Sequence, residues 1–299
     1  MNTFGDLVLS QTALQDYVEC PRRFELRYLR QLNWPALETR QALELESSME
    51  RGHEFHHLLH QHAMGVPAEV LGATIDDEVM VGWWRNYLEW QERNLPQERY
   101  PELSLTTSFT GSDETEPVLL MAKYDLVTRL ADGTLLIVDW KTGRPQRRSI
   151  LAERLQTVVY RYVLSRAGDW LNGGNPIEAE RIRMTYWYAT DSTTVDFDYD
   201  GEAWERDERR LASIIGSIRA EIQGRYEFPK TPDERGCRFC TYRSLCERGV
   251  EAGVIDGIGD PNVGLLNQAG QAGQAGGPDL EDLDAALSFD LDDLGEVSF

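Results

Sequence analysis

The sequence predicts an α/β protein with a mixed central sheet flanked by helices. Strand-like runs of β-branched and aromatic residues gather in the middle of the chain, and helical patterns come before, between and after them. The expected strands are residues 102–110, 118–130, 135–140, 181–189 and 194–199. Such an arrangement is typical of a sheet that is covered by helices.

Apolar residues at helical spacing predict the helices, which we expect at residues 10–32, 44–64, 76–94, 150–164 and 202–223. Ser10 is a suitable N-cap for the first of them, and Pro21 is a suitable start for a second helix within it. Asp132 and Gly133 form a turn signal between two strands, which predicts a β-hairpin.

Composition indicates a globular protein with a sizeable core. The 299 residues are 41% hydrophobic and include eight Trp, which suits one large domain or two intimate ones. No run approaches 18 uninterrupted apolar residues, and no charged segment with a long apolar stretch opens the chain, so we expect neither a membrane span nor a secretory signal. The expected location is the cytoplasm, where four Cys favour a metal site over disulfides.

The net charge of −21 argues at first against a nucleic-acid partner. Residues 250–299, however, hold 11 acidic residues and no Lys or Arg, whereas residues 141–166 hold seven basic residues and one acid. Arg22, Arg23, Arg27 and Arg30 form another basic cluster. Local basic patches contact phosphates, but on charge alone we favour the interpretation that they are solvated helix faces.

Residues 118–143 contain the most informative pattern. Asp125 lies within one expected strand, Asp139 ends the next, and Lys141 follows two residues later. Side chains alternate along a strand, so Asp139 and Lys141 share a face, and the hairpin brings Asp125 beside them. Two carboxylates can hold Mg²⁺ or Mn²⁺ for phosphodiester hydrolysis, with the lysine assisting. A surface salt bridge is the alternative, because an isolated Asp-x-Lys occurs often by chance.

Two further spacings surround this pattern. Gly52 precedes His56 by four residues, and Gln156 precedes Tyr160 by four. The complete series resembles the RecB-like branch of the PD-(D/E)xK nucleases, over roughly residues 10–248. The resemblance implies a restriction-endonuclease-like fold and a Mg²⁺- or Mn²⁺-dependent deoxyribonuclease, specifically an exonuclease acting on single-stranded DNA or DNA ends.

The resemblance also implies roles for individual residues. Asp125, Asp139 and His56 would bind the metal, Lys141 would be the catalytic lysine, and Gln156 and Tyr160 would position DNA. Glu102 is a weaker candidate, on a strand where some members place another acidic ligand. Asp in place of Glu before x-Lys is permitted in the family.

All five histidines lie within residues 51–62, and His53, His56, His57 and His60 share one helix face. One interpretation is a dedicated transition-metal site. We favour the other, in which His56 alone points into the cleft and its neighbours are solvated.

The cysteines suggest a second metal site. Cys237, Cys240 and Cys246 have the spacing C-x2-C-x5-C, and Cys20 stands alone near the start of the chain. Four thiolates suit Zn²⁺ or a 4Fe–4S cluster, and the spacing does not decide between them. The arrangement resembles the iron–sulfur subgroup of these nucleases, which includes CRISPR-associated RecB-like exonucleases. This implies a structural 4Fe–4S cluster that joins the N- and C-terminal segments.

These patterns divide the chain into four parts. We expect a helical region at 1–100, the nuclease core at 101–225, a cysteine segment at 226–250 and an acidic disordered tail at 251–299. Five leucines of the tail recur at helical spacing, so the tail could form a helix that docks on a protein partner or covers a basic groove. The alternative is an acidic tail that only keeps the protein soluble. No ATP phosphate loop occurs, so unwinding would require a helicase or another recombination or CRISPR protein. The rival interpretations are a non-catalytic DNA-binding or assembly subunit and an iron–sulfur electron-transfer protein.

Overall fold

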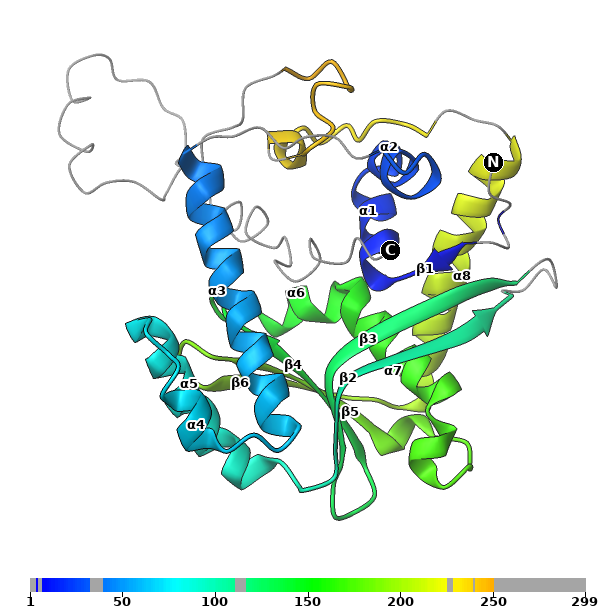
Figure 1. Cartoon of the computed structure of the whole chain (residues 1–299). Helices are drawn as coiled ribbons and strands as arrows, with labels where there is room; N and C mark the ends of the chain where they lie inside the picture. Colours follow the sequence, from blue (N-terminus) through cyan, green and yellow to red (C-terminus); the bar gives the residue numbers. More distant parts are fainter. Residues whose placement is uncertain are drawn as a thin grey trace, which may run out of the picture. The chain divides into compact units, whose positions relative to one another are not determined.

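A computed structural model describes residues 4, 7–32, 40–110, 117–224, 228–238 and 240–249 (Figure 1). The chain divides into two compact units, one of Met1–Leu32 with Glu50–Thr231 and one of Asn33–Met49 with Pro232–Phe299. The first unit contains the sheet. The acidic tail and its leucines lie outside the described residues.

The sheet has six strands: β1 Val8–Leu9, β2 Arg99–Phe109, β3 Val118–Arg129, β4 Leu135–Lys141, β5 Ile182–Tyr188 and β6 Thr193–Asp198. Their order is β1-β3-β4-β5-β6, and β2 pairs with β3. The pairs β1–β3 and β4–β5 are parallel, whereas β2–β3, β3–β4 and β5–β6 are antiparallel. The mixed central sheet that the sequence predicts is therefore confirmed.

The two edges of β3 are used differently. Along one edge, β2 pairs with nearly the whole length of β3, from Val118 to Thr128. The other edge is shared, since β1 pairs at Leu119 and Leu120 and β4 only from Leu126 to Arg129. β4 continues beside β5 as far as Lys141 after its pairing with β3 has ended. The two strands thus separate beyond Leu126 and Val138.

The helices of the first unit are numbered in chain order, except that α3 begins in the second unit. They are α1 Gln11–Glu19, α2 Pro21–Phe24, the π-helical turn η2 Glu25–Leu29, α3 Arg40–Ala63, α4 Ala68–Gly72, α5 Glu78–Asn94, α6 Arg148–Glu153, α7 Leu155–Ala167, the short 3-10 turns η3 Asp169–Asn172 and η4 Ala179–Arg181, and α8 Gly201–Gly224. The second unit contains the 3-10 turn η5 Arg235–Arg238. Within the described part of the chain, no helix is both long and apolar enough to span a membrane.

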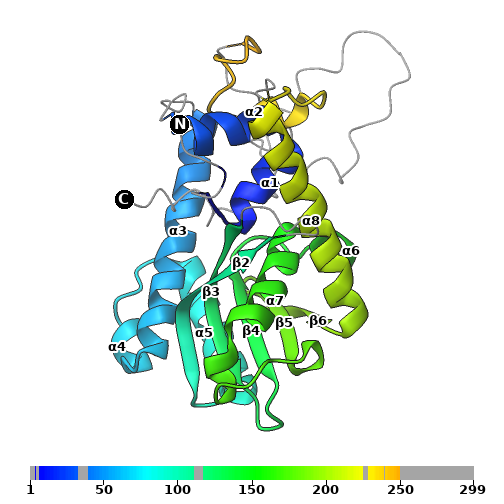
Figure 2. The ribbon, with the colours of Figure 1, turned by 90° about the vertical axis from the view of Figure 1, so that its right-hand side faces the viewer.

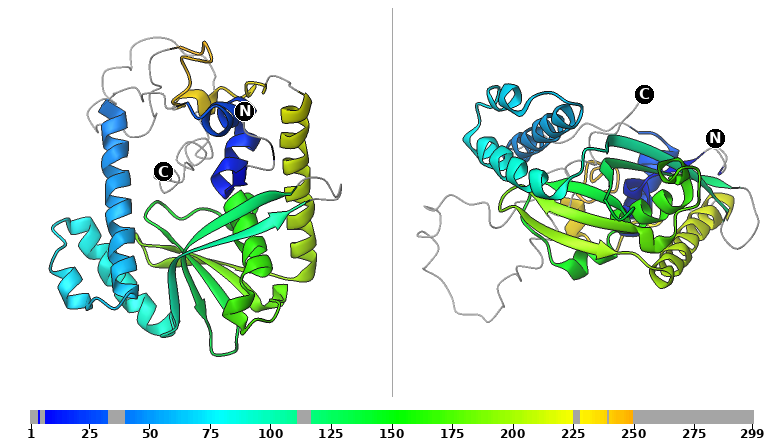
Figure 3. Two further views of the ribbon diagram at one scale, coloured as in Figure 1. Left: turned by 45° about the vertical axis from the view of Figure 1, so that its right-hand side comes forward. Right: turned by 90° about the horizontal axis from the view of Figure 1, so that it is seen from below.

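Helices lie on both faces of the sheet (Figure 3), and the described buried residues form two hydrophobic cores, one on each face. One core packs α1, α7 and α8 against residues such as Ile137 and Met184, and Figure 2 shows α7 and α8 on this side. The other core packs α3 and α5 against Val138, Trp140 and Trp187. Alternating side chains of β4 therefore belong to different cores, as expected for a buried strand.

Local signals in the sequence account for several boundaries. Ser10 caps α1 by accepting the N–H of Ala13 at 3.2 Å, and Pro21 begins α2. Gly133 has a φ of +86° in the turn between β3 and β4, which suits glycine. The hairpin and the cap were both predicted.

The two helical regions expected at 10–32 and 150–164 each contain a break. The first break is at Cys20, whose backbone is extended, just before the second helix that Pro21 was predicted to start, and the last part of this region is the π-helical turn η2. The helix expected at 150–164 breaks at Arg154, also extended, into α6 and α7. This second break starts α7 one residue before Gln156. The prediction also lacked the two-residue strand β1 and the short helix α4.

Candidate active site

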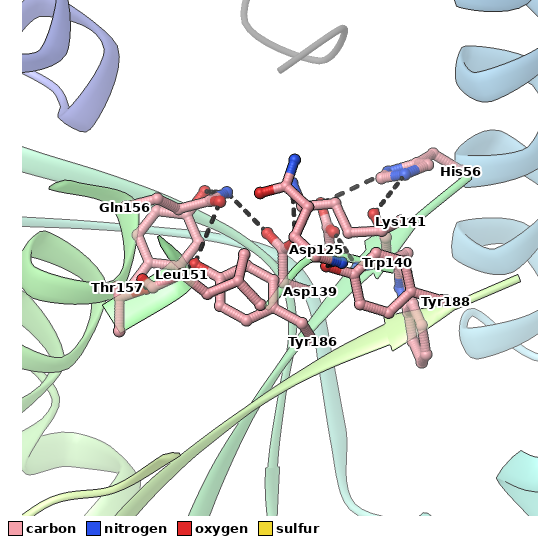
Figure 4. A network of polar contacts seen from close by, with 12 residues as sticks. His56, Asp125, Asp139, Trp140, Lys141, Leu151, Gln156, Thr157, Tyr186 and Tyr188 are labelled. Atoms are coloured by element: carbon pink, nitrogen blue, oxygen red, sulfur yellow. Dashed lines mark hydrogen bonds and ion pairs between the residues drawn. The ribbon is translucent and has the colours of Figure 1, made fainter. Parts of the chain in front are cut away.

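Asp125 and Asp139 lie where β3 and β4 separate (Figure 4). Continuing the β3–β4 register by one residue would place Asp125 opposite Asp139, but the pairing ends just before it. The backbone N–H of Trp140 donates instead to Oδ2 of Asp125 at 2.8 Å. The separation of the strands thus replaces a ladder hydrogen bond with one to a carboxylate.

Asp139 is 2% exposed and both of its oxygens have partners. Oδ2 lies 2.9 Å from Nζ of Lys141, and Oδ1 accepts a hydrogen bond of 2.7 Å from Nε2 of Gln156. Lys141 is itself 9% exposed. Burial of a carboxylate and an ammonium is costly unless they are paired, and this pairing compensates for it.

His56 reaches the site from α3. Its Nδ1 lies 3.5 Å from Oδ1 of Asp125, and its Nε2 lies 3.1 Å from the carbonyl oxygen of Trp140. Gly52, about one helical turn earlier, allows this approach, because a Cβ there would lie only 3.2 Å from Oγ1 of Thr142. The spacing G-x3-H therefore has a packing reason as well as a chemical one.

The pKa of Asp125 lies below its ordinary value of 3.8. Burial alone would raise the pKa, but His56, the N–H of Trp140 and the ammonium of Lys141 together favour the ionised form more strongly. Asp125 is therefore a carboxylate at neutral pH.

Gln156 and Tyr160 lie one turn apart on α7 and face the same site. Nε2 of Gln156 lies 3.4 Å from the hydroxyl of Tyr160, which also lies 3.5 Å from Nε2 of Gln11. Both side chains are buried, at 9% and 4% exposed. The structure thus brings Gln156 to Asp139, and Tyr160 to Gln156.

Sequence reasoning missed Tyr186 and Thr157. The hydroxyl of Tyr186 lies 3.3 Å from Oε1 of Gln156 and 2.8 Å from Oγ1 of Thr157. Tyr186 pairs with Asp139 in the parallel register of β4 and β5. The signal that could have revealed it is this register, which requires knowing that β5 lies beside β4.

Glu102 is at the edge of the site. It forms an ion pair of 2.9 Å with Lys123 and has a φ of +50°. With His56, His60 and Asp125 it lines a cavity of about 10 Å³, which is near the minimum for one water molecule.

The other histidines have different surroundings. His53 and His57 are exposed, and Nδ1 of His62 lies 3.0 Å from the hydroxyl of Tyr87. Of the five, His56 is the one that contacts Asp125.

Within the described residues, no three His, Cys, Asp or Glu side chains are gathered so as to hold a metal ion. The donors of His56, Asp125 and Asp139 nevertheless fit a hard divalent cation in type, since two are carboxylates and one is an imidazole. The Trp140 carbonyl adds an oxygen beside them.

A family model described as the PD-(D/E)XK nuclease superfamily matches residues 8–247. The chain belongs to the PD-(D/E)XK nuclease superfamily. The nuclease fold that the sequence predicts is confirmed, and members of this superfamily typically use Mg²⁺ or Mn²⁺. The RecB-like branch and the iron–sulfur cluster stay predictions.

The other comparisons add little to this membership. The chain is similar to a solved structure titled "Crystal structure of SSO0001", with 13% sequence identity and a TM-score of 0.40. The alignment covers 82% of this chain and 88% of that one. No curated protein matches the chain.

The cysteines of the nuclease lie in both units. Cys20 separates α1 from α2 in the first unit, and its N–H donates to the carbonyl of Asp16 at 2.9 Å. In the second unit, the N–H of Cys240 donates to the carbonyl of Cys237, whose Sγ accepts a 2.9 Å hydrogen bond from Arg248. All four are half-buried.

Proposed function

We propose that the protein is a Mg²⁺- or Mn²⁺-dependent deoxyribonuclease whose catalytic residues are Asp125, Asp139 and Lys141. The observation that carries the proposal is the buried Asp139–Lys141 pair beside Asp125, at the point where β3 and β4 separate. A chain of this superfamily with these groups together has the means to hydrolyse a phosphodiester.

Asp125, Asp139 and His56 would hold the metal. When bound, the ion would lower the pKa of a water molecule and neutralise charge on the scissile phosphate. Binding would require His56 to exchange its contact with the Trp140 carbonyl, and Asp139 to exchange part of its contact with Lys141.

Lys141 would act on the phosphate side of the reaction. An ammonium released from Asp139 can donate to the attacking water or to a phosphate oxygen. Gln156 would keep Asp139 oriented, through the hydrogen bond between its Nε2 and Oδ1. Gln156 and Tyr160 would also position the DNA backbone, exchanging their present contacts with Asp139 and Gln11.

The proposed substrate is single-stranded DNA or a DNA end, cut exonucleolytically. This preference follows from the resemblance to RecB-like nucleases. Arg144, Arg147 and Arg148 support a nucleic-acid substrate, because they are exposed and follow Lys141 closely in the chain. Arginine side chains in such a position can contact successive phosphates.

Cys20, Cys237, Cys240 and Cys246 are the proposed ligands of a structural 4Fe–4S cluster, with Zn²⁺ as the alternative. Their number and spacing support a four-thiolate site. The proposed partners are a helicase or another recombination or CRISPR protein, and the acidic tail is the proposed docking segment.

A second candidate function is a non-catalytic DNA-binding or assembly subunit. One observation favours it: both oxygens of Asp139 are already engaged, by Lys141 and Gln156. Such a protein would bind DNA without cutting it.

Cleavage of end-labelled single-stranded DNA by anaerobically purified protein separates the two functions. We expect cleavage with Mg²⁺ or Mn²⁺, a loss of about a hundredfold or more in Lys141→Ala, and retained activity in the control Lys230→Ala. The position of the released label gives the polarity. An intact wild type that binds DNA but leaves it uncut in both metals would favour the non-catalytic subunit.

A further inference from the structure

The side-chain amide of Gln156 has two ends of nearly the same shape but opposite hydrogen-bonding character. Its Nε2 faces Oδ1 of Asp139 at 2.7 Å, where an N–H is required. A rotation of 180° would bring Oε1 to the carboxylate and replace a hydrogen bond with repulsion between two acceptors. Something must therefore fix which end faces Asp139.

The other end of the amide contacts a short series of hydroxyl groups (Figure 4). Oε1 of Gln156 lies 3.3 Å from the hydroxyl of Tyr186, which lies 2.8 Å from Oγ1 of Thr157. Oγ1 of Thr157 also lies 2.6 Å from the carbonyl oxygen of Leu151. Tyr186 and Thr157 are each 0% exposed, so water does not substitute for these partners.

Counting protons shows which group donates in each of these contacts. The two hydroxyls supply two protons for three contacts, so one contact lacks its own proton. The Leu151 carbonyl can only accept, so its 2.6 Å contact with Oγ1 of Thr157 uses the threonine proton. The proton of Tyr186 is then available to Oε1 of Gln156, which also can only accept.

This assignment of the protons satisfies every hydrogen-bonding group of the Gln156 amide. Oε1 receives a donor, while the two protons of Nε2 serve Asp139 at 2.7 Å and Tyr160 at 3.4 Å. If Tyr186 donated to Thr157 instead, it would present only a lone pair to Gln156. The amide would then gain a partner at Tyr186 only by turning its oxygen toward Asp139.

The fold holds Tyr186 in place for this role. Tyr186 pairs with Asp139 across β4 and β5, and its ring lies 5.7 Å from Nζ of Lys141. It therefore lies beneath both members of the Asp139–Lys141 pair. Among the described residues, its hydroxyl is the group that contacts Oε1 of Gln156.

We propose that Tyr186 is a positioning residue for the metal-binding carboxylate Asp139: its hydroxyl donates to Oε1 of Gln156 and so fixes the amide with Nε2 toward Asp139. This rests on the proposed function, because the orientation of Asp139 matters to activity only if Asp139 binds metal. Substituting a group that orients a ligand in this way typically lowers metal affinity by roughly 10- to 100-fold.

The test is Tyr186→Phe, which removes one oxygen and leaves the ring. We expect calorimetric titration with Mn²⁺ to show about tenfold weaker binding. Tyr188→Phe is the matched control: it is on the same strand, is buried, and has a hydroxyl that accepts from the N–H of Gln146 at 3.2 Å, away from Gln156. Its Mn²⁺ affinity should equal that of the wild type.

A double substitution separates positioning from general destabilisation. Gln156→Ala should weaken Mn²⁺ binding by itself, and adding Tyr186→Phe should weaken it no further, because Tyr186 acts through Gln156. Wild-type affinity in Tyr186→Phe, or additive losses in the double variant, would overturn the proposal.

A second readout does not depend on metal. Nuclear magnetic resonance of the metal-free protein should show slow exchange of the Gln156 side-chain amide protons with water, and faster exchange in Tyr186→Phe. Equal exchange in both proteins would reject the positioning role. A wild type that binds no Mn²⁺ would instead reject the proposed function, and the exchange rates would still decide the role of Tyr186.

Discussion

Two aspartates of the site are held by different kinds of partner. Asp125 accepts from the backbone N–H of Trp140 and lies beside His56, whereas Asp139 contacts two side chains, Lys141 and Gln156. A backbone donor cannot be removed by substitution, but side-chain donors can. The position of Asp139 is therefore more sensitive to substitution of its partners than that of Asp125.

A half-buried histidine near the end of α3, His62, predicts a pH dependence of stability. Burial of His62 beside Trp84 and Tyr87 lowers its pKa below the ordinary 6.5, and the charge of Arg99 adds to this. As the pH falls through 6.5, His62 of the unfolded chain binds a proton before His62 of the folded protein does. Protonation therefore favours the unfolded state, and the stability that His62 contributes above pH 6.5 is lost as the pH falls.

We expect the free energy of unfolding to fall between about pH 7 and 5.5 more steeply in the wild type than in His62→Asn. Urea unfolding at both pH values measures this. His57→Asn, at an exposed position of the same helix, is the control and should keep the wild-type slope. Equal slopes in all three proteins would contradict the prediction.

Most residues of the site could be predicted from the sequence, because their spacing follows the periodicity of single elements. Asp139 and Lys141 share a face of one strand, and Gln156 and Tyr160 a face of one helix. Tyr186 could not be predicted, because its contacts join residues about 30 positions apart and its strand shows only a core pattern. The metal-binding and catalytic roles remain predictions.

At the scale of elements, the site depends on where strands and helices end. The separation of β3 and β4 after one short ladder frees the Trp140 N–H, and the break at Arg154 starts α7 next to Gln156. The sheet and its hairpins were predicted from alternation and turn residues. The break at Arg154 was not, because residues 150–164 contain no Gly or Pro.

The packing of α7 on α8 includes a buried ion pair. Nη2 of Arg161 lies 2.9 Å from Oδ2 of Asp207, and both side chains are less than 10% exposed. Burial raises the pKa of Asp207, and Arg161 opposes this shift. Removing Arg161 alone would leave a buried carboxylate without its cation.

We expect Arg161→Met to lower the free energy of unfolding by about 3–5 kcal/mol, and Arg161→Met with Asp207→Leu to recover most of it. Arg209→Met, which breaks an exposed pair with Glu205, should cost less than about 1 kcal/mol. Urea unfolding of the four proteins gives these values. A double variant as unstable as Arg161→Met would show that the pair itself is needed.

At the scale of the whole molecule, the proposed iron–sulfur cluster would connect distant parts of the sequence. Its proposed ligands are Cys20, near the start of the chain, and Cys237, Cys240 and Cys246. Joining such distant positions restricts the unfolded chain strongly. The cluster would therefore contribute to stability without taking part in hydrolysis.

Metal analysis of anaerobically purified protein tests the cluster. We expect about four iron and four acid-labile sulfide per chain, and loss of both in Cys20→Ser as completely as in Cys240→Ser. Ser244→Ala, within the same cysteine segment, should keep them. One zinc and no sulfide per chain would establish the alternative, and a full cluster in Cys20→Ser would remove that residue from the ligand set.

Trp140 belongs to two environments at once. Its peptide group contacts Asp125 and His56, while its indole packs edge-on against Trp187 and Trp90, with ring centroids 5.6 and 5.7 Å apart. Indoles at such distances and angles couple their electronic transitions and give circular dichroism bands of their own. Because the peptide group of Trp140 contacts Asp125, changes at Asp125 can be followed through these bands without an added label.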